Sequence, residues 1–165
     1  MKAFYATVEI EGFTFAFVVA DGKVIRAKFL TKESDEAFAE EIEREGIKAE
    51  RNPFALQHLV RLLQSYASGG RIALEKVPVF MNGSSHDVKV YKAIRRLTFG
   101  HTATYGEIAR IVGSSARAVG RALARNRVPL FIPCHRVIRS DGTLGGFTPS
   151  VEIKKLLLKL EGFSL

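Results

Sequence analysis

The N-terminal part of the chain alternates apolar and other residues with a period of two, and turn sequences break the alternation twice. Apolar side chains occupy alternate positions within residues 4–10 and 13–17, and a further apolar-rich run covers residues 24–30. Glu11-Gly12 and Asp21-Gly22 separate the three runs, and dipeptides of this kind favour tight hairpin turns. Because a period of two is the period of a β-strand, the pattern predicts a three-stranded antiparallel meander.

Two helices are predicted to follow these strands. Ser34 can cap the first, which is acidic, and Asn52-Pro53 can open the second, which ends at Gly69-Gly70. Residues 1–76 are therefore predicted to form a small α/β lobe, and nothing in its sequence indicates chemistry. The Pro- and Gly-containing stretch of residues 71–85 is typical of a connection between lobes.

Residues 77–165 are predicted to form a mostly helical domain. Apolar residues at helical spacing indicate a helix over residues 86–97. Thr104 and Glu107 have the spacing of a capping box, which places the start of a second helix at this point.

A helix-turn-helix motif is predicted next along the chain. Gly113 ends the second helix, and Ser114 or Ser115 can cap a third helix over residues 116–124. Three arginines lie four residues apart along this third helix and would share one side of it: Arg117, Arg121 and Arg125. The arrangement is typical of a DNA-recognition helix, although a solvated basic helix would have the same pattern.

The net charge of +8 is distributed unevenly. Residues 1–80 hold 11 Lys and Arg against 12 Asp and Glu, whereas residues 81–165 hold 14 against 5. A basic half joined to a neutral half is typical of a protein that binds a polyanion, because each neutralised phosphate releases counterions. On charge alone, a solvated basic surface remains an equal alternative.

Length and hydrophobicity favour a soluble protein. A chain of 165 residues with 47% apolar content can form one good core or two small lobes. No apolar run approaches the roughly 20 residues that span a membrane, and strand-like alternation begins where a signal peptide would lie. We therefore expect a cytoplasmic protein without a membrane partner.

The single cysteine of the chain lies in the sequence Pro133-Cys134-His135-Arg136-Val137, at the end of an apolar stretch. A thiol beside an imidazole and a guanidinium has the surroundings of a reactive cysteine. One cysteine excludes an internal disulfide, and the four histidines are too scattered to give the ligand spacing of a zinc site. The sequence therefore predicts a reactive thiol and no structural metal.

Several short blocks along the C-terminal half resemble a known family. They are Tyr105-Gly106-Glu107-Ile108-Ala109, Arg117-Ala118-Val119-Gly120, Asn126, Ile132-Pro133-Cys134-His135-Arg136-Val137-Ile138, Gly145-Gly146-Phe147 and Leu160-Glu161-Gly162. In order and spacing they resemble the O6-alkylguanine-DNA alkyltransferases over roughly residues 77–163. The resemblance implies an α/β fold with an N-terminal RNase H-like lobe and a C-terminal, mostly helical, winged-helix-like lobe that carries the helix-turn-helix motif.

The same resemblance implies a reaction. The family transfers an alkyl group from O6 of a guanine, flipped out of double-stranded DNA, to its own cysteine, once per molecule and without a cofactor. Cys134 would be the nucleophile, His135 the base acting through a water molecule, and Glu161 the group that orients the imidazole. Neighbouring residues of an extended segment point to opposite sides, so a direct contact between Cys134 and His135 would be awkward. The expected partner is duplex DNA containing O6-alkylguanine, bound by a monomer.

Other residues receive roles from the resemblance. Tyr105 would crowd the target phosphate, help to rotate the nucleotide out, and donate a hydrogen bond to the guanine. Arg117 would fill the space that the base leaves, Asn126 would pin the turn before the cysteine segment, and Arg136 would be a buried ion-pairing residue that holds the lobes together. The remaining candidates either lie at the DNA (Ala118, Gly120, Arg121) or line the guanine pocket (Leu123, Pro129, Val137, Gly145, Gly146, Phe147, Thr148).

Two other classes of protein fit parts of the sequence. A non-catalytic helix-turn-helix protein would bury Cys134 as a packing residue, and a Cys-His-Glu hydrolase would use the same thiol on a carbonyl and regenerate it. The reactive surroundings of Cys134 argue against the first class, and the basic C-terminal half argues against the second. Departures from the family pattern at His86-Asp87, Val90-Tyr91 and Asn126-Arg127 leave the range of alkyl groups undefined.

Overall fold

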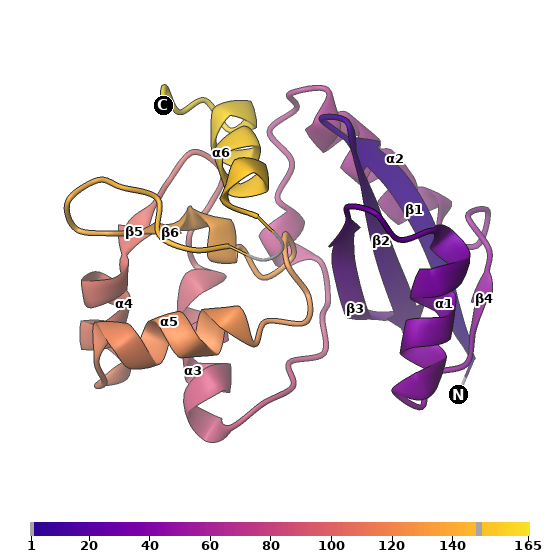
Figure 1. Ribbon diagram of the computed structural model, residues 1–165, viewed down its shortest axis with the longest axis horizontal. Helices are drawn as coiled ribbons and strands as arrows, with labels where there is room; N and C mark the ends of the chain where they lie inside the picture. Colours follow the sequence, from indigo (N-terminus) through magenta and orange to yellow (C-terminus); the bar gives the residue numbers. More distant parts are fainter. Residues whose placement is uncertain (1, 148–149) are drawn as a thin grey trace. The chain divides into compact units, whose positions relative to one another are not determined.

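The chain folds into two units, which a computed structural model describes over residues 2–147 and 150–165 (Figure 1). The first unit extends to Ile72 and includes Val77–Phe80, and the second combines Ala73–Lys76 with Met81–Leu165. The chain therefore passes from the first unit to the second and back between residues 72 and 81, within the stretch that the sequence indicated as a connection. The expected boundary, between residues 76 and 77, lies within this stretch.

The antiparallel meander predicted for the first unit is present. Strands β1 (Ala3–Ile10), β2 (Phe13–Ala20) and β3 (Lys23–Leu30) pair in sequence order. Both turn residues have positive φ in each hairpin, at 51° and 83° in Glu11–Gly12 and at 50° and 74° in Asp21–Gly22. Two consecutive positive φ angles are typical of the type I′ turn, whose twist matches that of the strands.

A fourth strand, which the sequence did not indicate, completes the sheet. Strand β4 (Ala49–Arg51) pairs with β1 in parallel, so that the sheet order is β3-β2-β1-β4. Its three residues are too few to show an alternating pattern. The pairing is also long-range, because helix α1 (Asp35–Arg44) lies between β3 and β4 in the sequence.

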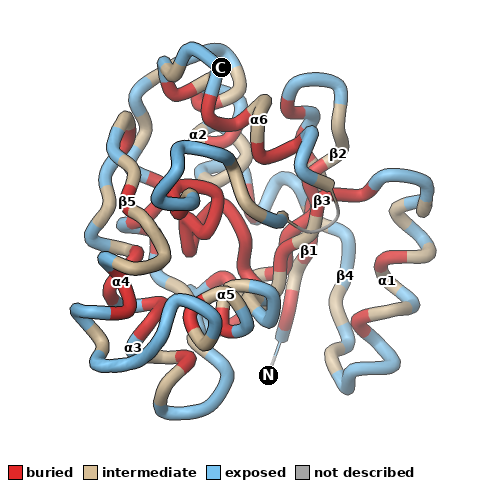
Figure 2. The backbone as a smooth tube through the Cα atoms, turned by 60° about the vertical axis from the view of Figure 1, so that its left-hand side comes forward, coloured by how far each residue is buried: buried red, intermediate tan, exposed pale blue. Residues whose placement is uncertain are grey.

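The core of the first unit occupies both faces of this sheet. Phe38 and Ile42 of α1 pack on one face, and helix α2 (Gln57–Ala67) packs against β1. Most positions of the central strands β1 and β2 are therefore buried (Figure 2). The odd-numbered strand positions contribute a cluster of aromatic rings, formed by Phe15, Phe17 and Phe29.

Three helices that pack on one another form the base of the second unit (Figure 1). They are α3 (Ser85–Ile94), α4 (Tyr105–Val112) and α5 (Ala116–Ala124). Helix α4 ends at Gly113, whose φ is 73°, and the Ser115 hydroxyl accepts a hydrogen bond from a backbone N–H of α5. Both helices and the turn of the predicted motif are therefore present.

The predicted capping box of α4 forms only in part. The Thr104 hydroxyl accepts a hydrogen bond from the Glu107 N–H, and the Glu107 carboxylate accepts one from the same hydroxyl. The Thr104 backbone instead belongs to strand β5 (Ala103–Thr104), which pairs in parallel with β6 (Val137–Ile138). A strand ladder thus replaces the second half of the box.

The remaining elements of the second unit are short or C-terminal. They are the 3₁₀ helices η1 (Leu74–Lys76) and η2 (Cys134–Arg136), and helix α6 (Val151–Leu160), which packs against η2. None of the described helices is long and apolar enough to cross a membrane. The RNase H-like and winged-helix-like descriptions of the two units stay predictions.

Candidate active site

The cysteine lies in a 3₁₀ turn and not in the extended segment that we expected. Pro133 precedes η2, and the Arg136 N–H donates to the Pro133 carbonyl across the turn. The backbone leading into this turn is also irregular, since Leu130 has a φ of 76°, which is rare for a residue with a side chain. The sequence argument about alternating directions therefore does not apply to Cys134 and His135.

Asn126 holds the cysteine segment from the end of α5. Its side-chain Nδ2 donates to the Ile132 carbonyl at 3.0 Å and to Cys134 Sγ at 3.2 Å. Its Oδ1 accepts from the Val128 N–H at 2.9 Å. One amide group thus bonds both ends of this irregular segment, an arrangement that suits the supporting role expected for Asn126.

The Cys134 thiol is buried, and its protonation reflects that position. Burial raises the pKa of the thiol, and the hydrogen bond from Asn126, the charge of Lys154 and nearby backbone N–H groups oppose this effect only in part. The resting thiol is therefore neutral at physiological pH. Because the thiolate is the nucleophile, reaction at this residue requires a base.

His135 is the residue predicted to be that base, and it contacts Glu161. The imidazole Nε2 lies 2.6 Å from Glu161 Oε2, and both side chains are fully buried. An ionised carboxylate can only accept, so Nε2 carries the proton and Nδ1 holds the free lone pair. Nδ1 is buried and has no hydrogen-bond partner among the described residues, so the residue that follows Cys134 keeps one ring nitrogen free to accept a proton.

Arg136 extends this pair into a buried chain of charges. Its Nε donates to Glu161 Oε1 at 2.8 Å, and one terminal nitrogen donates to Glu75 Oε1 and to the Leu97 carbonyl, both at 2.7 Å. Arg136 is therefore the buried ion-pairing residue that the sequence suggested. All of these partners lie in the second unit, so its role in joining two lobes stays a prediction.

These buried charges shift the pKa values of Glu161 and His135. Burial alone would raise the pKa of Glu161, but hydrogen bonds and charges from His135 and Arg136 outweigh it and lower the pKa to about 2. Burial lowers the pKa of His135, although Glu161 acts in the opposite direction. The resting site therefore holds an ionised Glu161 and a neutral imidazole.

Lys154 is a buried residue of the site that the sequence analysis did not identify. Its Nζ donates to the Val137 carbonyl at 2.6 Å and to the Gly146 carbonyl at 3.3 Å. Burial lowers its pKa to about 8, partly offset by Cys134. The available signal was a lysine within the buried face of α6, among Ile153, Leu157 and Leu158.

Tyr105 and Gly145 lie close together. The Tyr105 ring is half-buried, its centroid lies 5.7 Å from Lys154 Nζ, and burial raises the pKa of its hydroxyl. Gly145 has a φ of 75°, and a Cβ added to it would lie 2.6 Å from the Tyr105 hydroxyl. A Cβ on Gly120 of α5 would lie 3.9 Å from the same ring. Glycine at position 145 therefore makes room for Tyr105.

The other predicted pocket residues differ in burial. Val137 and Pro129 are buried, Leu123 and Phe147 are half-buried, and Gly146 is exposed. Thr148 lies outside the described residues.

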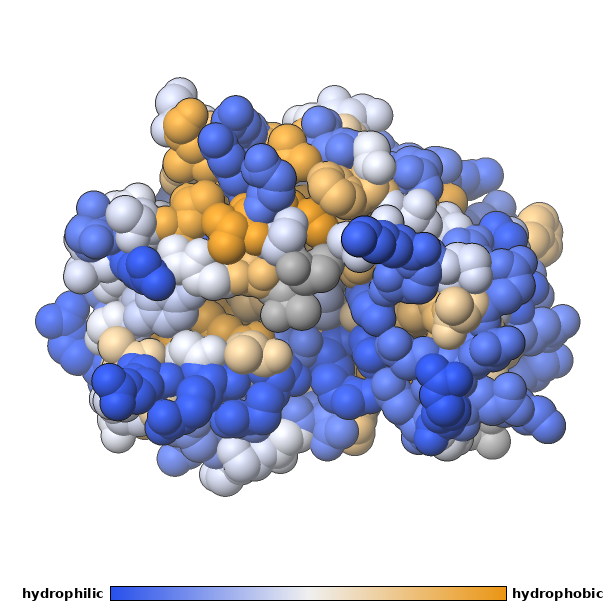
Figure 3. Space-filling model, in the orientation of Figure 1, coloured by the Kyte–Doolittle hydropathy of each residue, from blue (hydrophilic) through white to orange (hydrophobic). Residues whose placement is uncertain are grey.

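The three aligned arginines of α5 and its C-cap are all exposed, but their partners differ. Arg117 and Arg121 are exposed, beside half-buried Ala118. Arg125 instead pairs with the buried Asp87 of α3, with its nitrogens 2.6 Å and 3.1 Å from the two carboxylate oxygens. Figure 3 shows strongly hydrophilic side chains over α5.

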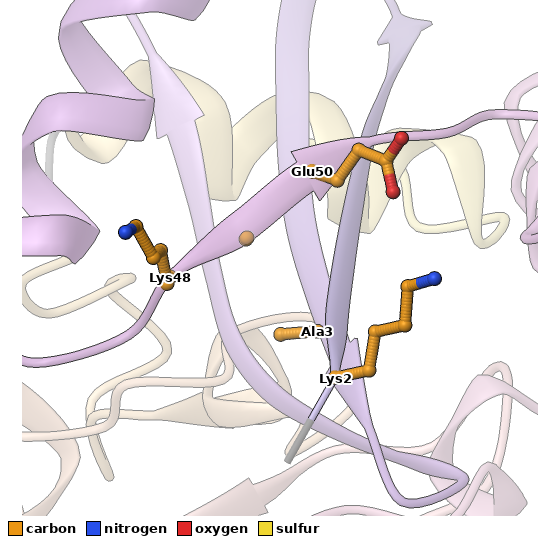
Figure 4. A pocket seen from close by; sticks show the side chains of 5 residues that line it. Lys2, Ala3, Lys48 and Glu50 are labelled. Carbon is orange, nitrogen blue, oxygen red and sulfur yellow. The ribbon is translucent and has the colours of Figure 1, made fainter.

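A shallow hollow in the first unit has no comparable chemistry. It lies beside β4 and is lined by Lys2, Ala3, Lys48, Ala49 and Glu50 (Figure 4). None of the predicted site residues lies there. Among the residues that the structure describes, no cluster of His, Cys, Asp and Glu could hold a metal ion.

Comparison with known proteins points to one family. Residues 85–163 match the model of the 6-O-methylguanine DNA methyltransferase DNA-binding domain. The chain is 44% identical over 104 residues to a methylated-DNA–protein-cysteine methyltransferase of Metallosphaera sedula, and the alignment covers 63% of this chain and 66% of that protein. A protein of the same name from Methanopyrus kandleri is 43% identical over 107 residues, which are 65% of this chain and 81% of the relative.

The fold is also similar to that of a solved protein. The crystal structure of Mycobacterium tuberculosis OGT in complex with DNA matches with a TM-score of 0.77 and 28% identity. The match covers 96% of this chain and 92% of that chain.

We expect Gly145→Ala to destabilise the protein more than Gly142→Ala does. Both glycines have positive φ, so each alanine should cost about 1 kcal/mol of backbone strain. Only a Cβ at position 145 meets Tyr105, and displacing that ring should add roughly 1–3 kcal/mol. Urea unfolding measures both costs, and equal losses of stability would contradict the packing proposed for Tyr105.

We expect Glu161→Gln to lower the free energy of unfolding by about 2–3 kcal/mol at neutral pH, because the buried Arg136 loses one of its two carboxylate partners. The pKa of Glu161 falls from 4.5 to about 2 on folding, so its contribution is complete above the ordinary pKa and is lost as the pH falls towards 2. The difference between variant and wild type should therefore narrow on acidification. Denaturation curves at several pH values test this, with the exposed Glu152→Gln as control; a difference independent of pH would be contrary to expectation.

Proposed function

The chain belongs to the family of methylated-DNA–protein-cysteine methyltransferases, and on this basis we propose that it repairs O6-alkylguanine in duplex DNA by transferring the alkyl group to Cys134. One observation carries the proposal: the 2.6 Å contact between His135 and Glu161 leaves a free lone pair on Nδ1 of the residue next to Cys134, whose buried thiol is neutral. This arrangement suits a cysteine whose thiol is neutral at rest and loses its proton to His135 during the reaction.

The transfer begins with removal of the thiol proton. A water molecule between the two side chains would take the Cys134 proton and pass one to His135 Nδ1, while Glu161 stabilises the imidazolium that forms. Asn126 and the nearby Lys154 lower the energy of the thiolate. The thiol is thus ionised within the buried site and does not depend on the small thiolate fraction of a free cysteine.

The second step moves the alkyl group. The thiolate sulfur attacks the alkyl carbon, a carbon–sulfur bond forms, and the bond between that carbon and O6 breaks, so that its electron pair stays on the guanine. A hydrogen bond from the Tyr105 hydroxyl stabilises the developing charge on the base, which takes up a proton to become guanine. The product thioether is stable, so each molecule reacts once and no cofactor is required.

DNA contacts come from the surface of α5. Arg117 and Arg121 are exposed on the helix that follows the Gly113 turn, and the similar Mycobacterium tuberculosis protein binds DNA. We propose that Arg117 occupies the space of the flipped base and that Arg121 contacts phosphate. Recognition would then depend on the damaged base and on the backbone, and not on a sequence of bases.

We expect Cys134→Ser to abolish the removal of O6-methyl groups from duplex DNA while DNA binding is retained. A serine hydroxyl is a far weaker nucleophile for saturated carbon, and the substitution leaves the surface of α5 unchanged. Base analysis of the duplex measures repair, and an electrophoretic shift measures binding. Repair by the serine variant at the wild-type rate would exclude Cys134 as the acceptor, and catalytic turnover by the wild type would favour a hydrolase.

Alanine substitutions at Arg117 and Arg121 should have different effects. Arg117→Ala should slow transfer roughly tenfold even at saturating DNA, because the flipped state loses the group that replaces the base. Arg121→Ala should weaken binding and reduce the slope of log K against log salt by about 1, without changing the saturated rate. Single-turnover rates and binding at several salt concentrations distinguish the two variants. If both variants change the rate and the salt dependence alike, Arg117 and Arg121 do not have the separate roles proposed.

A further inference from the structure

Glu75 is a buried carboxylate with no part in the steps described above. It lies in η1, is 4% exposed, and belongs to the second unit although it precedes α3 in the sequence. Its Oε1 accepts from an Arg136 terminal nitrogen at 2.7 Å, an ion pair in which both side chains are almost fully buried. A buried ion pair of this kind costs desolvation energy and is weak support for stability alone, so a further role is worth testing.

Cations surround both Glu75 and His135. Two cations act on it: Arg136 of η2 through the ion pair, and Arg95 at the end of α3 through its charge. At the other end of this row of buried charges, His135 faces Glu161, the residue that follows α6. Arg136, Lys154 and Cys134 lie nearby. Arg136 and Lys154 both oppose a positive charge on His135.

Proton uptake by His135 therefore adds a cation to a region that already holds several. Glu161 is shared, since one of its oxygens accepts from His135 and the other from Arg136. A second anion on the far side of Arg136 offsets part of its charge and leaves Glu161 more available to the imidazole. Buried charges a few ångströms apart interact strongly enough for this effect to be measurable.

We propose that Glu75 is a positioning residue of the His135 relay: its carboxylate shares Arg136 with Glu161 and offsets the positive charge that would otherwise oppose proton transfer from Cys134. The carboxylate itself neither gains nor loses a proton. The proton moves from Sγ through water to Nδ1, while Glu75 and Glu161 remain ionised. This inference rests on the function proposed above.

The test compares Glu75→Gln, which keeps the hydrogen bond and removes the charge, with Glu75→Asp, which keeps the charge. Methyl transfer from a saturating O6-methylguanine duplex is measured in single turnovers from about pH 5 to about pH 9. A less basic His135 should slow transfer about tenfold in Glu75→Gln and move the acid limb of the profile about one unit lower. Glu75→Asp should stay within about twofold of the wild type, as should Lys76→Gln at the exposed neighbouring position.

Arg95→Gln gives a second, opposite prediction. It removes a cation that acts on Glu75, so the acid limb should move to higher pH. If Glu75→Gln does not fold, the pH profile of Arg95→Gln tests the proposal by itself. If Glu75→Gln transfers more slowly but the acid limb of its pH profile matches the wild type, Glu75 has a structural role only. If the acid limb matches the wild type in both Glu75→Gln and Arg95→Gln, the proposal is overturned.

Failure of the proposed function can be told apart from failure of this inference. If the wild type transfers no methyl group, the His135 imidazole is titrated by NMR in wild type and Glu75→Gln, which requires no DNA. A lower midpoint in Glu75→Gln would support the electrostatic role of Glu75 without the repair reaction, and an unchanged titration would reject it.

Discussion

The carboxylate of Glu161 is the contact on which the rest of the site depends. One oxygen accepts from His135 and the other from Arg136, at 2.6 Å and 2.8 Å. The contact with His135 sets the imidazole tautomer, and the contact with Arg136 ties the turn that carries Cys134 to the end of α6. Because all three side chains are buried, loss of any one would leave a buried polar group with one partner fewer, which favours the observed geometry.

Side chains from two helices hold a backbone segment that has little regular structure of its own. Asn126, at the end of α5, bonds the segment before the cysteine, and Lys154 of α6 bonds the carbonyls of Val137 and Gly146. The positive φ of Leu130 in the same segment is a strained conformation that these contacts must maintain. Asn126 thus joins the end of α5 to the turn that carries Cys134 by hydrogen bonds.

Local features of this fold were predictable from sequence, and long-range ones were not. The hairpins at Glu11-Gly12 and Asp21-Gly22 and the helix stop at Gly113 follow from φ preferences of a few adjacent residues. Strand β4 and the Glu75–Arg136 ion pair depend on residues far apart in the chain, and no short pattern encodes them. The family resemblance singled out Cys134, His135 and Glu161 as candidates, whereas the 3₁₀ turn that carries Cys134 and His135 required coordinates.

The central claim is that Cys134 itself accepts the alkyl group. Intact-mass spectrometry after incubation with a duplex containing O6-methylguanine, followed by peptide mapping, tests it most directly. The account predicts one added methyl group per molecule, located on Cys134, with no further increase in excess DNA. An unchanged mass with retained DNA binding would contradict it, and would leave Cys134 as a packing residue of a non-catalytic DNA-binding protein.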